Sequence, residues 1–224
     1  GSNFVGVMGC AGAFGISLLV MLVANIGSPS NSVKLLLAGM ALSSVCSAFS
    51  SFVVFFAHDR DGMMSITYWL MGSLAGANWG NIAVILPLVI LCVFFFITQY
   101  RVLNLMLLGD EVSITLGTDL HKYRNFYLLV TSLMIGFIVY ASGMIGFVGL
   151  IVPHVVRILV GTDHKKLIPI SCLMGAILLV WADVLCRVMI KGTELPIGIL
   201  ISMIGAPCFI YLMAKKSYGF GGKE

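Results

Sequence analysis

Residues 143–164 read GMIGFVGLIVPHVVRILVGTDH. This stretch is an apolar run punctuated by glycines, and it contains the pair Pro153 and His154 and a single arginine, Arg157. In a bilayer, glycines permit close approach of helices, and a proline frees a backbone carbonyl that a neighbouring helix or water must satisfy. The stretch therefore predicts a membrane helix with a working role rather than a passive anchor.

The composition of the whole chain indicates the same class. Of its 224 residues, 60% are hydrophobic and only 10% are charged, and the mean hydropathy is +1.08. These values are typical of an all-α integral membrane protein. The net charge of +4 is explained by loops on one membrane face, because no basic run is long enough to indicate a nucleic-acid partner.

Apolar segments long enough to cross a bilayer divide the chain. A hydrocarbon core of about 30 Å requires about 20 helical residues. Seven spans are predicted, at residues 3–26, 33–57, 81–100, 125–143, 145–161, 167–189 and 195–214. Between the second and third, residues 62–78 contain Tyr68 and Trp69 and predict a short interfacial helix held by aromatic side chains.

The placement of lysine and arginine predicts the orientation in the membrane. Ten of the 13 basic residues lie at one set of helix ends. The positive-inside rule then places Asn31, residues 104–124, residues 162–166 and the C-terminal segment in the cytoplasm. The chain start and the loops that contain His58 and Lys191 are expected outside.

Several blocks of the sequence, in order, carry a resemblance to a known family. They are LLLAGMALSSVCSAF from Leu35, YWLMGSLAGANW from Tyr68, LNLMLLGDEVSITLG from Leu103, GFVGLIVPHVVRILVG from Gly146, ADVLCR from Ala182 and ELPIGILISMIGAPCFIYLM from Glu194. These blocks resemble the FecCD-type permease subunits of the ATP-driven importers for iron-siderophores, haem and vitamin B12. The resemblance implies a polytopic bundle of the family's ten-helix kind, with residues 1–224 as one permease domain that aligns from the fourth family helix onward. The first three family helices are therefore expected to be missing from this sequence.

The longest predicted cytoplasmic loop, residues 101–124, combines an amphipathic helix with a glycine stop. A short helix ended by a glycine can move as a rigid lever. The resemblance implies that this loop forms two short helices that dock into a groove on an ATPase. The residues expected to couple the two proteins are Leu108, Gly109, Asp110, Glu111 and Gly117. An ordinary solvated connector is the alternative.

Asp183 and Arg187 lie four residues apart, a spacing that allows an ion pair on one helix face. The resemblance implies a further role for Arg187, the docking of a substrate-binding protein through one of its glutamates. The two interpretations are compatible.

Small residues in the second predicted span form a set that includes Gly39, Ser43, Ser47 and Ser51. Close helix packing is one interpretation of this set. The resemblance implies that the corresponding helix lines the translocation path. For Pro153 and His154 we expect a helix kink in which the histidine bonds the exposed backbone groups, in preference to a proton relay or a metal site.

The sequence contains no Walker A motif, nucleophile elbow, HExxH or paired carboxylates, so no catalytic residue is predicted. The six cysteines are scattered singly, and no metal site is expected. The resemblance implies a non-catalytic translocation subunit for an iron-siderophore, or a haem- or cobalamin-like chelate, in the inner membrane of a bacterium.

The implied partners are a second permease copy or a paired permease, a cytoplasmic ATPase dimer and an extracytoplasmic binding protein. No cofactor is expected in this chain, since the ATPase would hold the Mg-ATP. Two alternatives stay open, an ion-coupled secondary transporter and a non-transporting membrane scaffold. The first would need an ionisable group near the bilayer midplane, for which Asp183 is the one acid in a predicted span.

Overall fold

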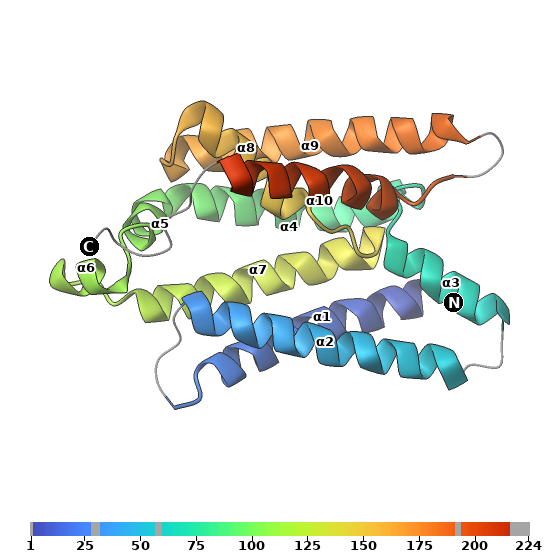
Figure 1. Cartoon of the computed structure of the whole chain (residues 1–224), viewed down its shortest axis with the longest axis horizontal. Helices are drawn as coiled ribbons and strands as arrows, with labels where there is room; N and C mark the ends of the chain where they lie inside the picture. The colour runs from blue at the N-terminus through green and yellow to red at the C-terminus, as the bar shows by residue number, and fades with distance from the viewer. Residues whose placement is uncertain (1, 28–31, 57–59, 191–193, 216–224) are drawn as a thin grey trace.

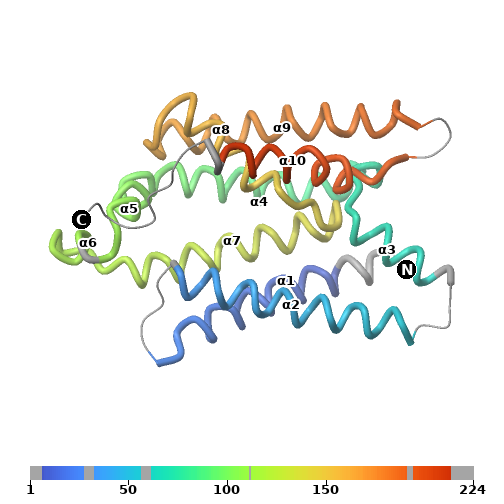
Figure 2. Tube along the Cα trace, viewed as in Figure 1, coloured from blue at the N-terminus to red at the C-terminus, as the bar shows by residue number. Residues whose placement is uncertain are grey.

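The computed structural model describes residues 2–27, 32–56, 60–190 and 194–215, and within these ranges the chain is an all-helical bundle without strands (Figures 1 and 2). Its helices are α1 (Ser2–Ala24), α2 (Ser32–Phe56), α3 (Arg60–Met71), α4 (Trp79–Thr98), α5 (Tyr100–Met106), α6 (Asp110–Thr115), α7 (Leu120–Ser142), α8 (Val148–Val160), α9 (His164–Met189) and α10 (Ile197–Lys215).

Each of the seven predicted spans corresponds to a helix. Five are long and apolar enough to cross a membrane: Val7–Ala24, Val33–Phe56, Trp79–Thr98, Leu120–Ser142 and His164–Met189. The other two are the shorter apolar helices Val148–Val160 and Ile197–Leu212. With 13 residues, α8 rises only about 20 Å. Its predicted start at residue 145 was too early, because Phe147 adopts a left-handed conformation and the helix begins after it.

Side-chain caps set the beginnings of three long helices. Asn78 caps α4 by accepting a hydrogen bond from the Asn81 amide at 2.9 Å, and Asp119 and Asp163 cap α7 and α9 in the same way. Such side-chain acceptors satisfy amide groups that a helix start leaves unpaired. As a result α7 and α9 begin before the predicted residues 125 and 167.

The long helices lie side by side (Figure 1). Helix α1 packs along α7, where a Cβ added to Gly136 would lie 3.0 Å from the Cys10 sulfur, so a larger side chain would force the helices apart. Helices α8, α9 and α10 form a second group around two buried clusters. One contains Val152, Val156 and Leu167, and the other contains Ala182, Cys186, Ile197, Leu200 and Ile201.

The two ends of the bundle carry different short helices (Figure 1). The short helix predicted within 62–78 is α3, and it lies at the end where the chain starts. Helices α5 and α6 lie at the opposite end, as the predicted orientation requires. The positions Asn31, His58 and Lys191, on which part of that orientation depended, lie outside the described residues.

Candidate functional site: the loop between α4 and α7

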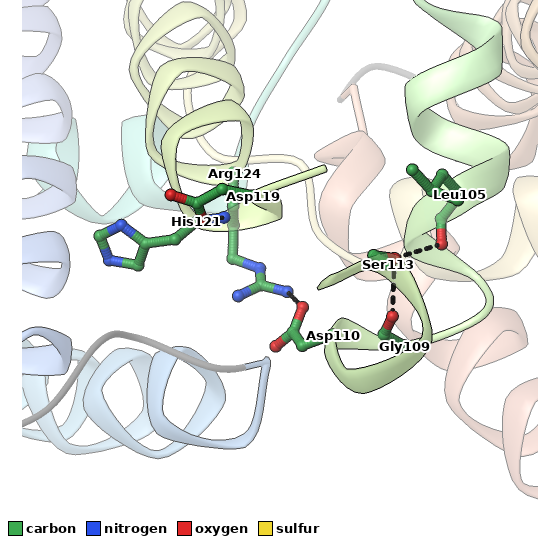
Figure 3. Close-up of polar contacts among 7 residues, drawn as sticks. All are labelled: Leu105, Gly109, Asp110, Ser113, Asp119, His121 and Arg124. Carbon is green, nitrogen blue, oxygen red and sulfur yellow. Dashed lines mark hydrogen bonds and ion pairs between the residues drawn. The ribbon is translucent and has the colours of Figure 1, made fainter. Parts of the chain in front are cut away.

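The loop between α4 and α7 is folded around one buried serine (Figure 3). Ser113, in α6, is completely buried, and its hydroxyl lies 2.7 Å from the carbonyl oxygen of Gly109 and 3.3 Å from that of Leu105 in α5. A buried hydroxyl must find such partners, because leaving it unpaired costs about 1–3 kcal/mol. Ser113 thus holds α6 against the end of α5.

Two glycines bound α6. Gly109 precedes it at φ 89° and ψ 167°, a region of backbone space that is essentially restricted to glycine. Gly117 follows it at φ 80°. The Gly117 amide bonds the Ile114 carbonyl and the Thr118 amide bonds the Ser113 carbonyl, both at 2.9 Å. These two backbone hydrogen bonds form the Schellman motif, which ends a helix at a left-handed residue. The predicted glycine stop at Gly117 is therefore confirmed.

An ion pair joins α6 to α7. The Asp110 carboxylate lies 2.5 Å from the Arg124 guanidinium. The Arg124 side chain is only 13% exposed, which limits its access to water. Figure 3 shows the pair bridging the two helices beside the Asp119 cap. Helix α6 is therefore linked to the N-terminal part of α7 by a contact stronger than a solvated surface pair.

A polar cluster joins α5 to the turn between α8 and α9. The Asn104 amide nitrogen donates to Asp163 Oδ1 at 2.8 Å, and the Asn104 Oδ1 accepts from the His164 backbone at 2.9 Å. The Asn104 hydrogen bond, together with that from the Lys165 amide, holds the pKa of Asp163 below its usual value. The charged form of this cap is therefore stabilised.

The outward face of the loop is apolar although it lies at a polar end of the bundle. Its exposed aliphatic side chains are Leu107, Leu108, Val112, Ile114 and Leu116. The most exposed of them, Ile114, is 68% accessible. A group of exposed aliphatic side chains rimmed by polar residues is typical of a protein interaction surface.

The five residues predicted to couple this chain to an ATPase all lie in this loop. Leu108 belongs to the apolar face, Gly109 and Gly117 bound α6, and Asp110 forms the ion pair. Glu111 is the second residue of α6, and its side chain lies outside the described part of the structure. Sequence reasoning missed Ser113 and Asn104, whose contacts depend on how the loop folds.

Arg187 lies at the opposite end of the bundle from this loop. Its Nε donates to Asp183 Oδ2 at 2.8 Å, so the predicted ion pair on α9 is present. A second guanidinium nitrogen lies 3.7 Å from Glu194 Oε1, a partner that the spacing on one helix could not indicate. The Arg187 side chain is 46% exposed and remains accessible to a partner protein.

The residues predicted to line a path occupy one row of α2. The three serines Ser43, Ser47 and Ser51 are exposed, and Ser51 donates to the Ser47 carbonyl at 3.0 Å within the helix. Gly39 begins the row one turn earlier and is partly buried. This row and the loop at the end of the bundle are separate features, and the path remains a prediction.

Pro153 lies inside α8, where it cannot donate a backbone hydrogen bond. The His154 ring packs edge-on against Phe209 of α10, with the ring centroids 6.3 Å apart. The neighbouring helix therefore contacts this position, and the kink role expected for the pair stays a prediction.

The fold and the folded loop define a multi-pass, all-helical membrane protein with a folded loop at one end that exposes aliphatic side chains. The chain belongs to the FecCD transport family, whose family model matches residues 1–215.

Curated relatives and a solved structure support this assignment. The chain is 35% identical over 215 residues to the hemin transport system permease protein HmuU of Yersinia pestis, covering 96% of this chain and 63% of HmuU. It is 36% identical over 217 residues to the vitamin B12 import system permease protein BtuC of Salmonella typhi, covering 95% of this chain and 64% of BtuC. The chain thus spans a little under two thirds of the length of these relatives.

A solved structure described as an inward-facing conformation of a metal-chelate type ABC transporter has a TM-score of 0.83 with this chain. The two are 31% identical, and the match covers 96% of this chain and 73% of the other.

Proposed function

We propose that this chain is the membrane-spanning permease subunit of an ATP-driven importer. Its cargo is an iron-siderophore or a haem- or cobalamin-like chelate, delivered by a binding protein. The observation that carries the proposal is the loop between α4 and α7, in which a glycine-bounded helix presents exposed aliphatic side chains at one end of the bundle. The names of the relatives, which include a hemin and a vitamin B12 permease, support the class of cargo.

The loop is suited to receiving force from a partner. Ser113 and the Asp110–Arg124 pair join α5, α6 and α7 through short polar contacts. A helix held in this way moves with its neighbours when a partner protein shifts it. Residues 101–124 thus act as a coupling loop that docks on a cytoplasmic ATPase dimer, and the Mg-ATP is bound and hydrolysed by that dimer.

The other end of the bundle suits a binding protein. Arg187 presents a half-exposed guanidinium there, and a carboxylate on the binding protein can compete for it with Asp183 and Glu194. Such charge-assisted contacts orient a partner and set its register. The permease works as a homodimer or with a paired permease around a central path, in the inner membrane of a bacterium.

A secondary transporter is a weaker proposal. It requires an ionisable group near the bilayer midplane. Asp183 lies six residues before the end of α9 and is paired with Arg187, so it is occupied in an ion pair near one end of the span.

The test is reconstitution of the purified permease in lipid nanodiscs with its ATPase and binding protein. Haemin, a ferric hydroxamate siderophore and cyanocobalamin are supplied in turn. Stimulation of ATP hydrolysis by one loaded binding protein is the expected result, and it identifies the cargo. If the ATPase hydrolyses ATP, the binding protein binds its chelate and the permease is folded in the nanodisc, but the three never form a complex, the importer proposal is wrong.

A further inference from the structure

Asn104 brings together two segments that lie 59 residues apart in the sequence. It stands in α5, at the beginning of the coupling loop, and the residues that it contacts form the start of α9. The contact does not involve α6 or α7, so it is distinct from the Ser113 and Asp110 contacts described above.

One amide group makes three hydrogen bonds here. Its nitrogen donates to Asp163 Oδ1, and its oxygen accepts from both the backbone nitrogen and the Nδ1 of His164, at 2.9 and 2.7 Å. A carbonyl oxygen has two lone pairs, so the oxygen of Asn104 is saturated. Because that oxygen can only accept, Nδ1 of His164 carries a hydrogen, which it keeps whether the ring is neutral or protonated. The hydrogen bond from Nδ1 is therefore kept in both charge states of His164.

The same Asp163 oxygen also caps α9. It accepts from the Lys165 amide at 3.1 Å as well as from Asn104. The cap matters more than usual in this helix, since Pro169 has no amide hydrogen to donate to the Lys165 carbonyl. The first turn of α9 thus depends on Asp163 and Asn104 for its position.

Helix α9 connects the two ends of the molecule. It has 26 residues and is about 39 Å long. It begins at the contact with α5 and carries Asp183 and Arg187 near its other end. A shift of its first turn therefore reaches the region where the binding protein is expected to dock.

We propose that Asn104, Asp163 and His164 form a clasp that passes movement of the coupling loop into α9. These are positioning residues, and the proposal rests on the function proposed above. The clasp attaches the loop to α9, as the Asp110–Arg124 pair attaches α6 to α7. Displacement of the loop by the ATPase moves both helices.

The test measures how much ATP is hydrolysed per chelate imported, in nanodiscs that contain the permease, its ATPase and its binding protein. Asn104→Leu has a similar size and removes all three hydrogen bonds. Asn104→Asp keeps the size but places a second carboxylate against Asp163. Both variants are expected to raise the ratio at least about fivefold, the lower limit of typical allosteric couplings. Asp163→Asn retains an acceptor oxygen and is expected to stay near the wild-type ratio.

The matched control is Asn78→Ala. Asn78 caps α4 through a single backbone amide at 2.9 Å, as Asp163 caps α9, but it precedes α4, whereas the loop follows the other end of that helix. Loss of the Asn78 cap should lower thermal stability without changing the amount of ATP hydrolysed per chelate imported. A second readout is hydrogen exchange in the peptide that contains His164, which should be faster in Asn104→Leu even without any partner.

The outcomes distinguish a failure of the clasp proposal from a failure of the importer proposal. Faster exchange with a wild-type ratio in both Asn104 variants would show a contact that only stabilises the fold, and the clasp proposal would be wrong. If the wild-type complex itself gives no hydrolysis in response to a loaded binding protein, the proposed function fails, and the coupling role of the clasp fails with it.

Discussion

Gly117 ends α6 in a conformation that side chains with a Cβ adopt only at a cost. Its φ of 80° lies in the left-handed region, where a β-branched residue loses about 1–2 kcal/mol. Gly117→Val should therefore loosen the end of α6 and let the ATPase hydrolyse ATP with less uptake. Gly117→Asn is the control, because asparagine adopts this conformation readily. Uptake and hydrolysis measured together in nanodiscs check the prediction, and normal coupling in Gly117→Val would contradict the role of the loop.

Single residues also show where sequence reasoning ends. The glycine stop at Gly117 was predicted because it depends on local backbone geometry. The contacts of Ser113, Asn104 and Glu194 were not predicted, because they exist only after the chain has folded. Asn104, for example, resembles any loop asparagine until α9 is placed beside it. Polar residues in the last turns before a long apolar segment, such as Asp119 and Asp163, were the available signal for caps.

Between elements, the Asp110–Arg124 pair sets how firmly α6 is held to α7. Removing one partner leaves the other charge poorly compensated, most of all for Arg124, whose side chain is mostly buried. A double-mutant cycle with Asp110→Asn and Arg124→Gln should give a coupling in the free energy of unfolding of at least about 1 kcal/mol, the upper end of the range for exposed pairs. Hydrogen exchange in the α6 peptide should rise in both single variants. Strictly additive effects would mean that the pair does not hold α6.

On α9, Arg187 has two carboxylates near it, and each leaves part of the guanidinium accessible. Arg187→Glu reverses the charge and places three acids together, so binding-protein affinity should fall about tenfold, as expected for a lost charge-assisted contact. The loss should shrink at high salt because the charges are screened. Asp183→Asn, which keeps the arginine, should retain docking. Equal affinity of Arg187→Glu and wild type in a binding titration would leave only the ion pair within the helix.

The existence of the helices was predicted well, because it depends on the length of each apolar segment. The start of α8 was predicted poorly, because it depends on the local backbone conformation. All seven apolar segments form helices, because a run of about 20 apolar residues has few alternatives in a bilayer. The extent of α8 was overestimated, since Phe147 lies in a left-handed conformation that interrupts the apolar run without any change in composition. A hydropathy pattern cannot detect such a backbone change.

For the whole molecule, α2 is a spanning helix that packs mainly against α1. Apart from α1, few elements contact it, and its large side chains, such as Phe49, Phe52 and Phe55, are exposed. Exposed aromatic side chains on a spanning helix fit either lipid or a second permease. The serines of the row at Ser43, Ser47 and Ser51 are more polar than lipid contact favours, so we expect this row to face a path at the axis of a dimer.

Cysteine labelling tests which face of α2 is accessible to water. The six native cysteines are all free and must first be replaced. Ser47→Cys should then react with a membrane-impermeant, water-soluble thiol reagent while the importer turns over, and the modification should block uptake. Val45→Cys is the matched control, because Val45 is also exposed but lies two residues away, on nearly the opposite face of the helix. Labelling of Val45→Cys with protection of Ser47→Cys would place the path on the other face of α2.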